Sequence, residues 1–231
     1  MNSQAYRAPV AELVGTALFV FFGAGSVVAN ASGIPLGPIG IALAHGVGMS
    51  VLITLTMSVS GGHLNPAVSL ALWLAQKIDG RKFATYVAAQ LVGGIIGALL
   101  IKAFFATGVG RVTSLGTPQI SGALTLFEAI GVEALLTFFL VSAVFGTAVS
   151  PDAPKVGGFG IGLAIFTCAL VCGSLTGAAM NPARAFGPAL VSLDWHGQIV
   201  YWIGPGVGAS LAAALWRYVL LPRDATDIRL G

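Results

Sequence analysis

The sequence contains few charged residues. Only 8% of its 231 residues are Asp, Glu, Lys or Arg, none of these lies between Glu12 and Lys77, and 56% of the residues are hydrophobic. So many apolar side chains exceed what the core of one water-soluble domain could bury. A soluble protein is thereby excluded, and we expect an all-α integral membrane protein.

Cysteine and histidine are also scarce. The two cysteines, Cys168 and Cys172, lie four residues apart in one apolar run, so we interpret them as packing residues and expect no disulfide framework or zinc site. The three histidines form no metal-spaced cluster, and no nucleophile has an evident base. We therefore expect no catalytic residues, no metal, no cofactor and no enzymatic activity.

Six apolar runs are long enough to cross a bilayer, which takes roughly 20 helical residues at about 1.5 Å each. Stretches rich in Gly, Pro, Ser or charge separate them, including "TGVGRVTSLGTPQISG". The predicted spans are Val10 to Ala29, Ile39 to Ser60, Phe83 to Ala106, Leu124 to Val149, Val156 to Leu175 and Gln198 to Leu221.

The basic residues are scattered, so the net charge of +3 predicts no nucleic-acid partner and serves as an orientation signal. On one side of the six-span topology lie Lys102 and Arg111, and on the other lie Arg7, Lys77, Arg81, Lys82, Lys155, Arg217, Arg223 and Arg229. We therefore expect both termini in the cytoplasm and a multi-pass protein of the cell (plasma or inner) membrane.

The two halves of the chain resemble one another. "AELVGTALFVFF" from Ala11 is echoed by "VEALLTFFLVSA" from Val132, which aligns Glu12 with Glu133 at an offset of 133 − 12 = 121. Three spans per copy is an odd number, so the second copy must enter the membrane from the opposite face. We expect a single channel domain over 1–231, with inverted repeats of about 8–106 and 124–221.

Glycines spaced four apart recur in the predicted spans and fit close helix packing. The pairs are Gly93 and Gly97, Gly158 and Gly162, and Gly204 and Gly208.

The tripeptide Asn-Pro-Ala occurs once in each half. The copies are Asn65, Pro66 and Ala67 in "GGHLNPAVSL", and Asn181, Pro182 and Ala183 in "GAAMNPARAF". Asn suits a helix N-cap and Pro suits the first helical position. The apolar segments that follow, Val68 to Ala75 and Ala185 to Leu193, are too short to span, so each motif predicts a re-entrant half-helix.

Two opposed half-helices would line a lumen near the membrane centre. Each N-terminus carries roughly half a positive charge, and irregular backbone at that depth is tolerable only where it is buried or lines a wet cavity. Asn65 and Asn181 would offer amide donors there, and the backbone carbonyls along the path would be those of Gly61, Gly62, His63, Leu64, Gly177, Ala179 and Met180. Such a lumen suits water and small neutral solutes and opposes protons and cations.

Glu12 and Glu133 are the intramembrane acids of this arrangement. An ion-coupled secondary transporter, the alternative class, also has inverted repeats and would have only these two groups for coupling. Because the acids occupy equivalent places in the two halves, we interpret them as structural groups that accept backbone N–H bonds from the loop before each half-helix.

With its two motifs, six spans, inverted halves and paired acids, the whole chain resembles the aquaporin (major intrinsic protein) family. The resemblance implies a homotetramer with one pore per subunit, surrounded by membrane lipid and driven by gradients without ATP or cofactor. The glycerol-conducting branch has an Asp after the Arg of the second motif and a basic residue four positions later, where this chain has Ala185 and Ala189. Tyr201 and Trp202 also resemble the water-channel branch.

The resemblance further implies an outer selectivity filter at family spacings from the two motifs. The four positions are occupied by His45, Ala169, Ala178 and Arg184. The water-selective filter of the family has Phe and His where this chain has His45 and Ala169, so a wider pore is implied, similar to that of plant vacuolar aquaporins that also pass ammonia. Water together with a small neutral solute such as ammonia is the expected cargo, and a glycerol- or urea-permeable channel is the alternative.

Overall fold

The structure, a computed structural model, describes residues 6–105 and 107–222. Arg223 and Arg229, which the topology prediction counts, and Ala106, the predicted end of the third span, lie outside these residues. In the part that is described, every regular element is a helix. The first half contains α1 (Arg7–Ala31), α2 (Gly37–Ser60), α3 (Pro66–Leu74), α4 (Gly80–Phe104), α5 (Thr107–Val112) and the short η1 (Ser114–Gly116). The second half contains α6 (Leu126–Val144), the π-turn η2 (Phe145–Val149), α7 (Phe159–Thr176), α8 (Pro182–Ser192), α9 (Val200–Leu215) and the π-turn η3 (Trp216–Leu220).

The long helices correspond to the six predicted spans. Five are long and apolar enough to cross a membrane, namely α1, α2, α4, α6 with η2, and α7. The sixth predicted span is α9, with 16 residues, continued by the 5 residues of η3. Several ends were predicted wrongly by a few residues, since α6 begins at Leu126 and α7 at Phe159. The helices α5 and η1 lie in a segment that was expected to be only a loop.

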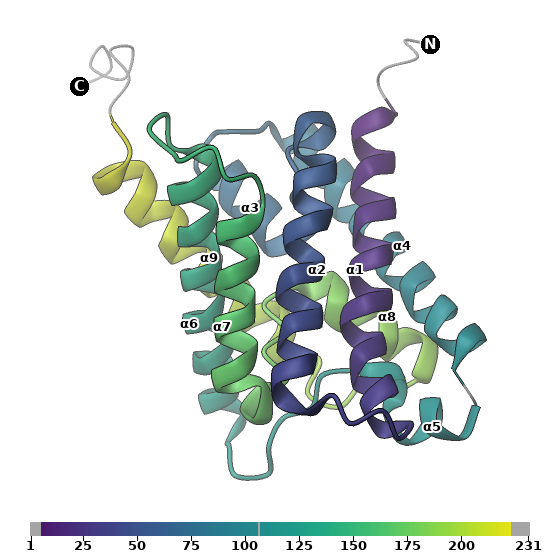
Figure 1. Ribbon diagram of the computed structural model, residues 1–231. Coiled ribbons are helices and arrows are strands. Elements are labelled where there is room, and N and C mark those ends of the chain that lie inside the picture. Colours follow the sequence, from purple (N-terminus) through teal and green to yellow (C-terminus); the bar gives the residue numbers. More distant parts are fainter. Residues whose placement is uncertain (1–5, 106, 223–231) are drawn as a thin grey trace.

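The two halves share one plan, which confirms the inverted repeat. Helix α1 packs against α2 and α4, as α6 packs against α7 and α9. The half-helix of each half packs on a long helix of the other, α3 on α9 and α8 on α4. Figure 1 shows α3 toward one end of the bundle and α8 toward the other, with the start of α1 and the end of η3 at the same end. With an even number of spans, the first and the last span must have their chain ends on the same side of the membrane, as is seen here.

Glycines allow the long helices to approach closely. Side chains added at Gly93 and Gly97 of α4 would collide with the carbonyls of Leu13 and Ala17 in α1. The same relation holds for Gly204 and Gly208 against α6, and for Gly158 and Gly162 against α2. The prediction of small-residue helix packing is therefore confirmed.

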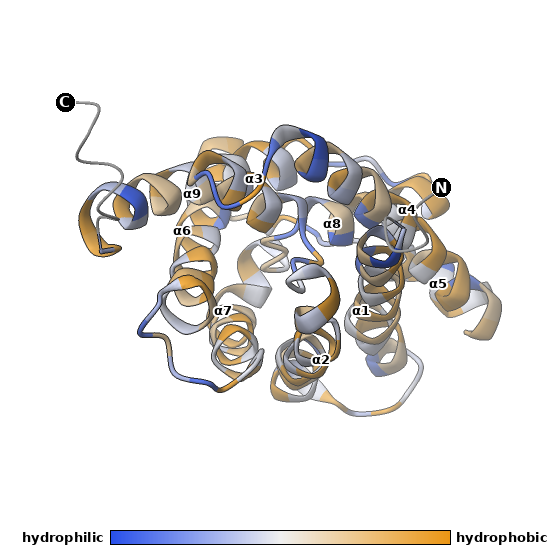
Figure 2. Cartoon of the chain, turned by 90° about the horizontal axis from the view of Figure 1, so that it is seen from above, coloured by the Kyte–Doolittle hydropathy of each residue, from blue (hydrophilic) through white to orange (hydrophobic). Residues whose placement is uncertain are grey.

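The outer surface of the bundle is apolar. Figure 2 shows hydrophobic residues along all the long helices, and many of these residues are exposed. On α2 they form a continuous stripe, every member of which is between 39% and 67% exposed: Ile39, Leu43, Val47, Val51, Leu55 and Val59. In water such a stripe would be a large exposed patch, so its natural surroundings are lipid or another protein surface.

Candidate functional site

The half-helices begin where the sequence predicts. Asn65 is the N-cap of α3, and its side-chain oxygen accepts the backbone N–H of Ala67 at 2.8 Å. Asn181 is the N-cap of α8 and accepts the N–H groups of Ala183 at 3.0 Å and Arg184 at 3.3 Å. Both caps have extended backbone, and proline follows each of them without losing a hydrogen bond. The predicted caps are confirmed.

The two asparagines also tie the loops to one another. The Asn65 amide donates to the carbonyl of Met180 at 2.8 Å, and the Asn181 amide donates to the carbonyl of Leu64 at 2.9 Å. Each asparagine thus bonds to the residue immediately before the other one. One N–H of each amide is used in this way, and among the described residues the second makes no hydrogen bond.

These cross-bonds involve two of the carbonyls that are expected along the path. The carbonyls of Leu64 and Met180 are partly engaged by the asparagines, so only their second lone pairs can bind a solute. Both residues have left-handed backbone, with φ of 50°. This conformation brings each carbonyl within reach of the opposite asparagine.

Glu12 and Glu133 accept hydrogen bonds from the loops before the half-helices. Glu12 accepts the N–H groups of His63 at 2.9 Å and Leu64 at 2.6 Å. Glu133 accepts those of Ala179 at 2.9 Å and Met180 at 2.7 Å. Both carboxylates are completely buried, and each also accepts a hydrogen bond from a hydroxyl group, that of Ser60 at 2.6 Å for Glu12 and that of Thr176 at 2.7 Å for Glu133. These hydrogen bonds agree with the interpretation of Glu12 and Glu133 as structural groups that hold the loops before the half-helices.

Two tyrosines, missed as site residues, add another symmetric layer. The Tyr86 hydroxyl donates to the carbonyl of Ser60 at 2.7 Å, and the Tyr201 hydroxyl donates to that of Thr176 at 2.8 Å. Their offset, 201 − 86 = 115, is close to the repeat offset and could have identified the pair. Each tyrosine holds the end of the helix that enters the motif loop.

A further polar group, also missed, occurs only in the first half. Gln90 donates to Glu12 at 2.8 Å and to the Ser69 hydroxyl at 3.0 Å. The His63 ring contacts the same hydroxyl at 3.0 Å and lies edge-to-face on Tyr86. One repeat offset of 116 later, Ser69 corresponds to Ala185 and His63 to Ala179, so internal symmetry offered no signal for this group.

The predicted filter residues His45 and Arg184 contact one another. The Arg184 guanidinium donates to the carbonyl of Gly116 at 2.9 Å and lies 3.4 Å from Nε2 of His45. Nδ1 of His45 lies 2.9 Å from the carbonyl of Ile41, which can only accept, so Nδ1 carries a proton. Nε2 is then the acceptor for Arg184. Both side chains are buried, with exposures of 6% for His45 and 2% for Arg184.

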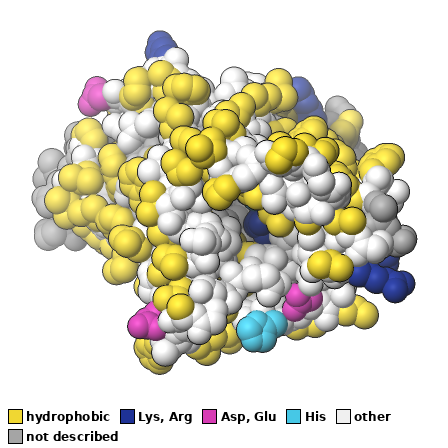
Figure 3. Space-filling view, turned by 60° about the horizontal axis from the view of Figure 1, so that its bottom comes forward, with side chains coloured by type: hydrophobic (Ala, Val, Ile, Leu, Met, Phe, Trp, Pro, Cys, Tyr) yellow, Lys and Arg dark blue, Asp and Glu magenta, His cyan; other side chains and the backbone are white. Residues whose placement is uncertain are grey.

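An outer pocket of about 540 Å³ opens beside these two residues. Its lining includes His45, Ala169, Gly177 and Arg184, but the fourth predicted filter residue, Ala178, is buried and does not belong to it. Figure 3 shows the hollow on this face with basic atoms at its floor, and Arg184 is the basic residue among those that line it.

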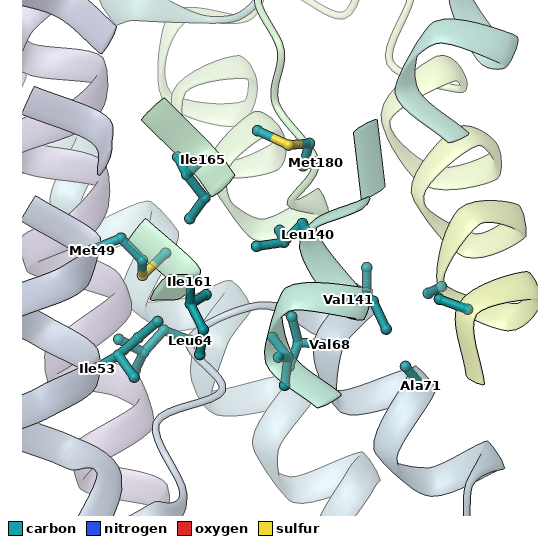
Figure 4. Close-up of a cluster of buried hydrophobic side chains, with 14 of the residues drawn as sticks. Met49, Ile53, Leu64, Val68, Ala71, Leu140, Val141, Ile161, Ile165 and Met180 are labelled. Carbon is teal, nitrogen blue, oxygen red and sulfur yellow. The ribbon is translucent and has the colours of Figure 1, made fainter. Parts of the chain in front are cut away.

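An inner pocket of about 340 Å³ lies on the side of the chain ends. Its polar lining includes Gly61, Gly62, His63 and Asn65, with Lys77 and Lys82 toward the mouth. The rest of its lining is mainly apolar, and Figure 4 shows some of these side chains, which come from several helices: Met49, Ile53, Val68, Leu140, Ile161 and Ile165. A lining that combines polar and apolar groups suits a path that binds water only weakly.

A membrane bundle with two half-helices whose N-termini meet between two pockets defines a transmembrane channel. The chain belongs to the major intrinsic protein family, whose model matches residues 1–216.

Its relatives include proteins named as aquaporins. The chain is 39% identical over 236 residues to probable aquaporin TIP2-2 of Oryza sativa subsp. japonica, covering 98% of this chain and 92% of that protein. It is 35% identical to aquaporin-4 of Mus musculus over 222 residues, covering 94% of this chain and 68% of that protein. The X-ray structure of the aquaglyceroporin from Plasmodium falciparum has a TM-score of 0.80 at 24% identity, covering 97% of this chain and 99% of that one. This last similarity shows the fold.

Proposed function

We propose that the chain is a passive channel for water and a small neutral solute such as ammonia, and that it excludes protons and ions. The observation that carries the proposal is the meeting of Asn65 and Asn181, each of which caps a half-helix and bonds across to the other loop. Because each asparagine bonds to the residue before the other one, the two positive helix ends lie close together, and the remaining amide N–H groups would bind a molecule between them. A water molecule held there by its oxygen cannot accept a proton from its neighbour, as in aquaporin-type pores generally.

The remaining predicted residues have supporting roles in this proposal. Glu12 and Glu133 hold the motif loops, Arg184 repels cations and orients solutes, and the backbone carbonyls of the two loops accept hydrogen bonds from passing molecules. His45 offers an apolar ring edge and a nitrogen already engaged by Arg184. The names of the relatives, which are aquaporins, support the choice of water as the main solute.

The small side chain of Ala169 supports a second solute. Ala169 lines the outer pocket together with His45 and Arg184, which contact one another. A methyl group at that place leaves room that a bulky ring would fill, so ammonia should pass. Glycerol and urea are larger, and their entry decides between this proposal and an aquaglyceroporin-like channel.

The assembly and location are also proposed. The α2 stripe and similar exposed apolar residues on α1, α6 and α7 support a homotetramer of single-domain subunits within lipid. The basic residues on the side of the chain ends favour cytoplasmic termini, and we propose the cell membrane as the location.

The filter is tested by light scattering of reconstituted vesicles after osmotic shocks with an impermeant osmolyte, glycerol, urea or an ammonium gradient. The double variant His45→Phe/Ala169→His should retain water flow and lose solute entry, because two larger rings narrow the outer pocket. Ile39→Phe, on the exposed face of the same α2 helix, is the matched control and should behave as wild type. Wild-type vesicles that pass water but no solute would overturn the widened filter, and vesicles without water flow would overturn the channel.

A further inference from the structure

A third pocket, of about 300 Å³, lies apart from both pore pockets, beside the outer end of α4. None of the pore residues discussed above lines it. Its lining is formed by Phe105, Gly110, Leu115, Val191 and Leu193, together with the polar residues Lys102, Arg111 and Ser192. The pocket thus lies between the end of α4, the short α5 and the C-terminal end of α8.

The charged side chains that line this pocket, among the described residues, are all positive. Lys102 and Arg111 are the exposed Lys and Arg residues of the outer side in the described part of the chain, and both line this pocket. Among the described residues that line it there is no acid. The nearest acid in the sequence, Asp194, accepts hydrogen bonds from Gln119 at 2.9 Å and from the backbone of His196 at 3.2 Å. Two cations without a carboxylate fit a phosphate group.

Lys102 differs from its counterpart in the other half. Arg217, at an offset of 217 − 102 = 115, donates to the carbonyl of Leu74 at 2.8 Å and so caps the C-terminal end of α3. In the described part of the chain Lys102 has no hydrogen bond of this kind to the end of α8. Its ammonium group is therefore available to a ligand.

The surroundings of the cations are apolar. Phe104, Val112 and Leu193 are 73%, 87% and 77% exposed, which is unfavourable in water. Along α4, a stripe of exposed residues leads from the membrane interior toward Lys102: Val92, Ile96 and Leu99. Basic groups at the end of an apolar stripe match an amphiphile with an anionic head and a hydrocarbon tail.

We propose that this pocket binds the phosphate headgroup of an anionic glycerophospholipid from the leaflet opposite the chain ends. Lys102, Arg111 and the Ser192 hydroxyl bind the phosphate oxygens, and one acyl chain lies along Val92, Ile96 and Leu99.

Native mass spectrometry of the detergent-solubilised full chain tests the proposal. Phosphatidylglycerol and phosphatidylcholine with identical acyl chains are added separately. Wild type should retain one more phosphatidylglycerol per chain than Lys102→Ala/Arg111→Ala, and phosphatidylcholine should show no such difference. The control Arg81→Ala/Lys155→Ala removes the same charge from exposed residues on the other side and should retain lipid as wild type does. The variant Lys102→Arg/Arg111→Lys should also retain it.

Equal phosphatidylglycerol retention by wild type and Lys102→Ala/Arg111→Ala would overturn the site, as would no retention by wild type. Equal binding of phosphatidylcholine at the site would overturn the anionic headgroup. Competition by sn-glycerol 3-phosphate at the same concentration as the lipid would show a site for a free phosphate and would overturn the lipid. Unchanged water permeability of the double-alanine variant in vesicles shows that it is folded, so loss of lipid cannot be attributed to unfolding.

Discussion

The Arg184 side chain carries the positive charge of the proposed filter. It is 2% exposed, and its hydrogen bonds to Gly116 and His45 fix the guanidinium plane. Its Nε has no hydrogen-bond partner among the described residues. A buried donor without a partner is unusual in a folded protein.

Arg184→Val should admit cations to the pore, because the variant removes the buried charge that repels them. We expect proton flux across vesicles, followed with an internal pH dye, to rise above the wild-type value while water flow continues. Arg184→Lys is the control, since it keeps the charge and loses only the forked geometry. Equal proton flux in wild type and Arg184→Val would mean that Arg184 does not contribute to exclusion.

Glu133→Gln should destabilise the second half. A glutamine can accept with only one of its two terminal atoms, so either the Thr176 and Ala179 bonds or the Met180 bond loses its acceptor. Leaving a buried donor unpaired costs about 1–3 kcal/mol of unfolding free energy. Thermal unfolding in detergent measures this loss, with Asp152→Asn, the analogous exchange at an exposed residue, as the control. Equal stability of Glu133→Gln and the control would contradict the role of the acid.

Some residue roles were predictable and others were not. Glu12 and Glu133 could be paired because each half repeats its neighbours at a near-constant offset. Gln90 and Ser69 could not be found in this way, because the second half has no counterpart to the group they form. The bond between Arg184 and Gly116 depends on a turn that was expected to be a plain loop.

At the scale of elements, the half-helices depend on close backbone contact. The α8 helix crosses α4 at Gly187, where an added side chain would collide with the Gly94 carbonyl. The crossing brings the second motif against a long helix of the first half, and so fixes the position of Asn181.

Gly187→Ala should therefore destabilise the fold, by about 1–3 kcal/mol as for other overpacked interiors. Gly131→Ala in α6 is a matched control, since an added methyl group there meets nothing within 4 Å. At such a site alanine raises the free energy of unfolding by up to about 1 kcal/mol relative to glycine, because it has the higher helix propensity. Chemical or thermal unfolding in detergent should separate the two variants, and a Gly187→Ala protein as stable as Gly131→Ala would contradict the close crossing.

The loop after α8 contains a carboxyl group with a lowered pKa. Hydrogen bonds from the Ser114 side chain, the His196 backbone and the Gln119 side chain hold the pKa of Asp194 below its ordinary value of 3.8. A depressed native pKa stabilises the fold above the unfolded pKa, and this contribution is lost as the pH falls through the native pKa.

Asp194→Asn should reduce this pH dependence. The loss of stability between about pH 5 and about pH 3 should be larger in wild type than in the variant, because only wild type loses the Asp194 contribution. The effect is modest because the side chain is largely solvated. Melting temperatures of wild type and Asp194→Asn across this pH range provide the measurement. Identical pH profiles of the two proteins would contradict the contribution of Asp194.

Local sequence patterns predicted where helices begin better than they predicted the contacts between the helices and loops. Asn followed by Pro defined the start of α3 and α8 because capping depends on adjacent residues. The cross-bonds from Asn65 to Met180 and from Asn181 to Leu64 join residues 115 and 117 positions apart, so only the folded arrangement reveals them. The sequence likewise contains no periodic pattern from which the π-turns at the ends of α6 and α9 could be predicted.

At the scale of the whole molecule, the inverted repeat determines where the site lies. Two equivalent halves of opposite orientation bring their half-helices together in the interior, with one pocket on each side. Hydropathy and the repeat were sufficient to predict this plan, because in lipid only helices satisfy the backbone of a span. The sequence did not reveal the third pocket, which depends on α5 and on the asymmetric end of α4.

The central claim is that the paired asparagines let water pass and block ions. Its most direct test measures osmotic water flow by light scattering and ion current across a planar bilayer, with the same purified protein. We predict water flow well above that of protein-free vesicles and no proton or potassium current at any applied voltage. An ion current, or transport that requires an ion gradient, would contradict the account and favour a coupled transporter.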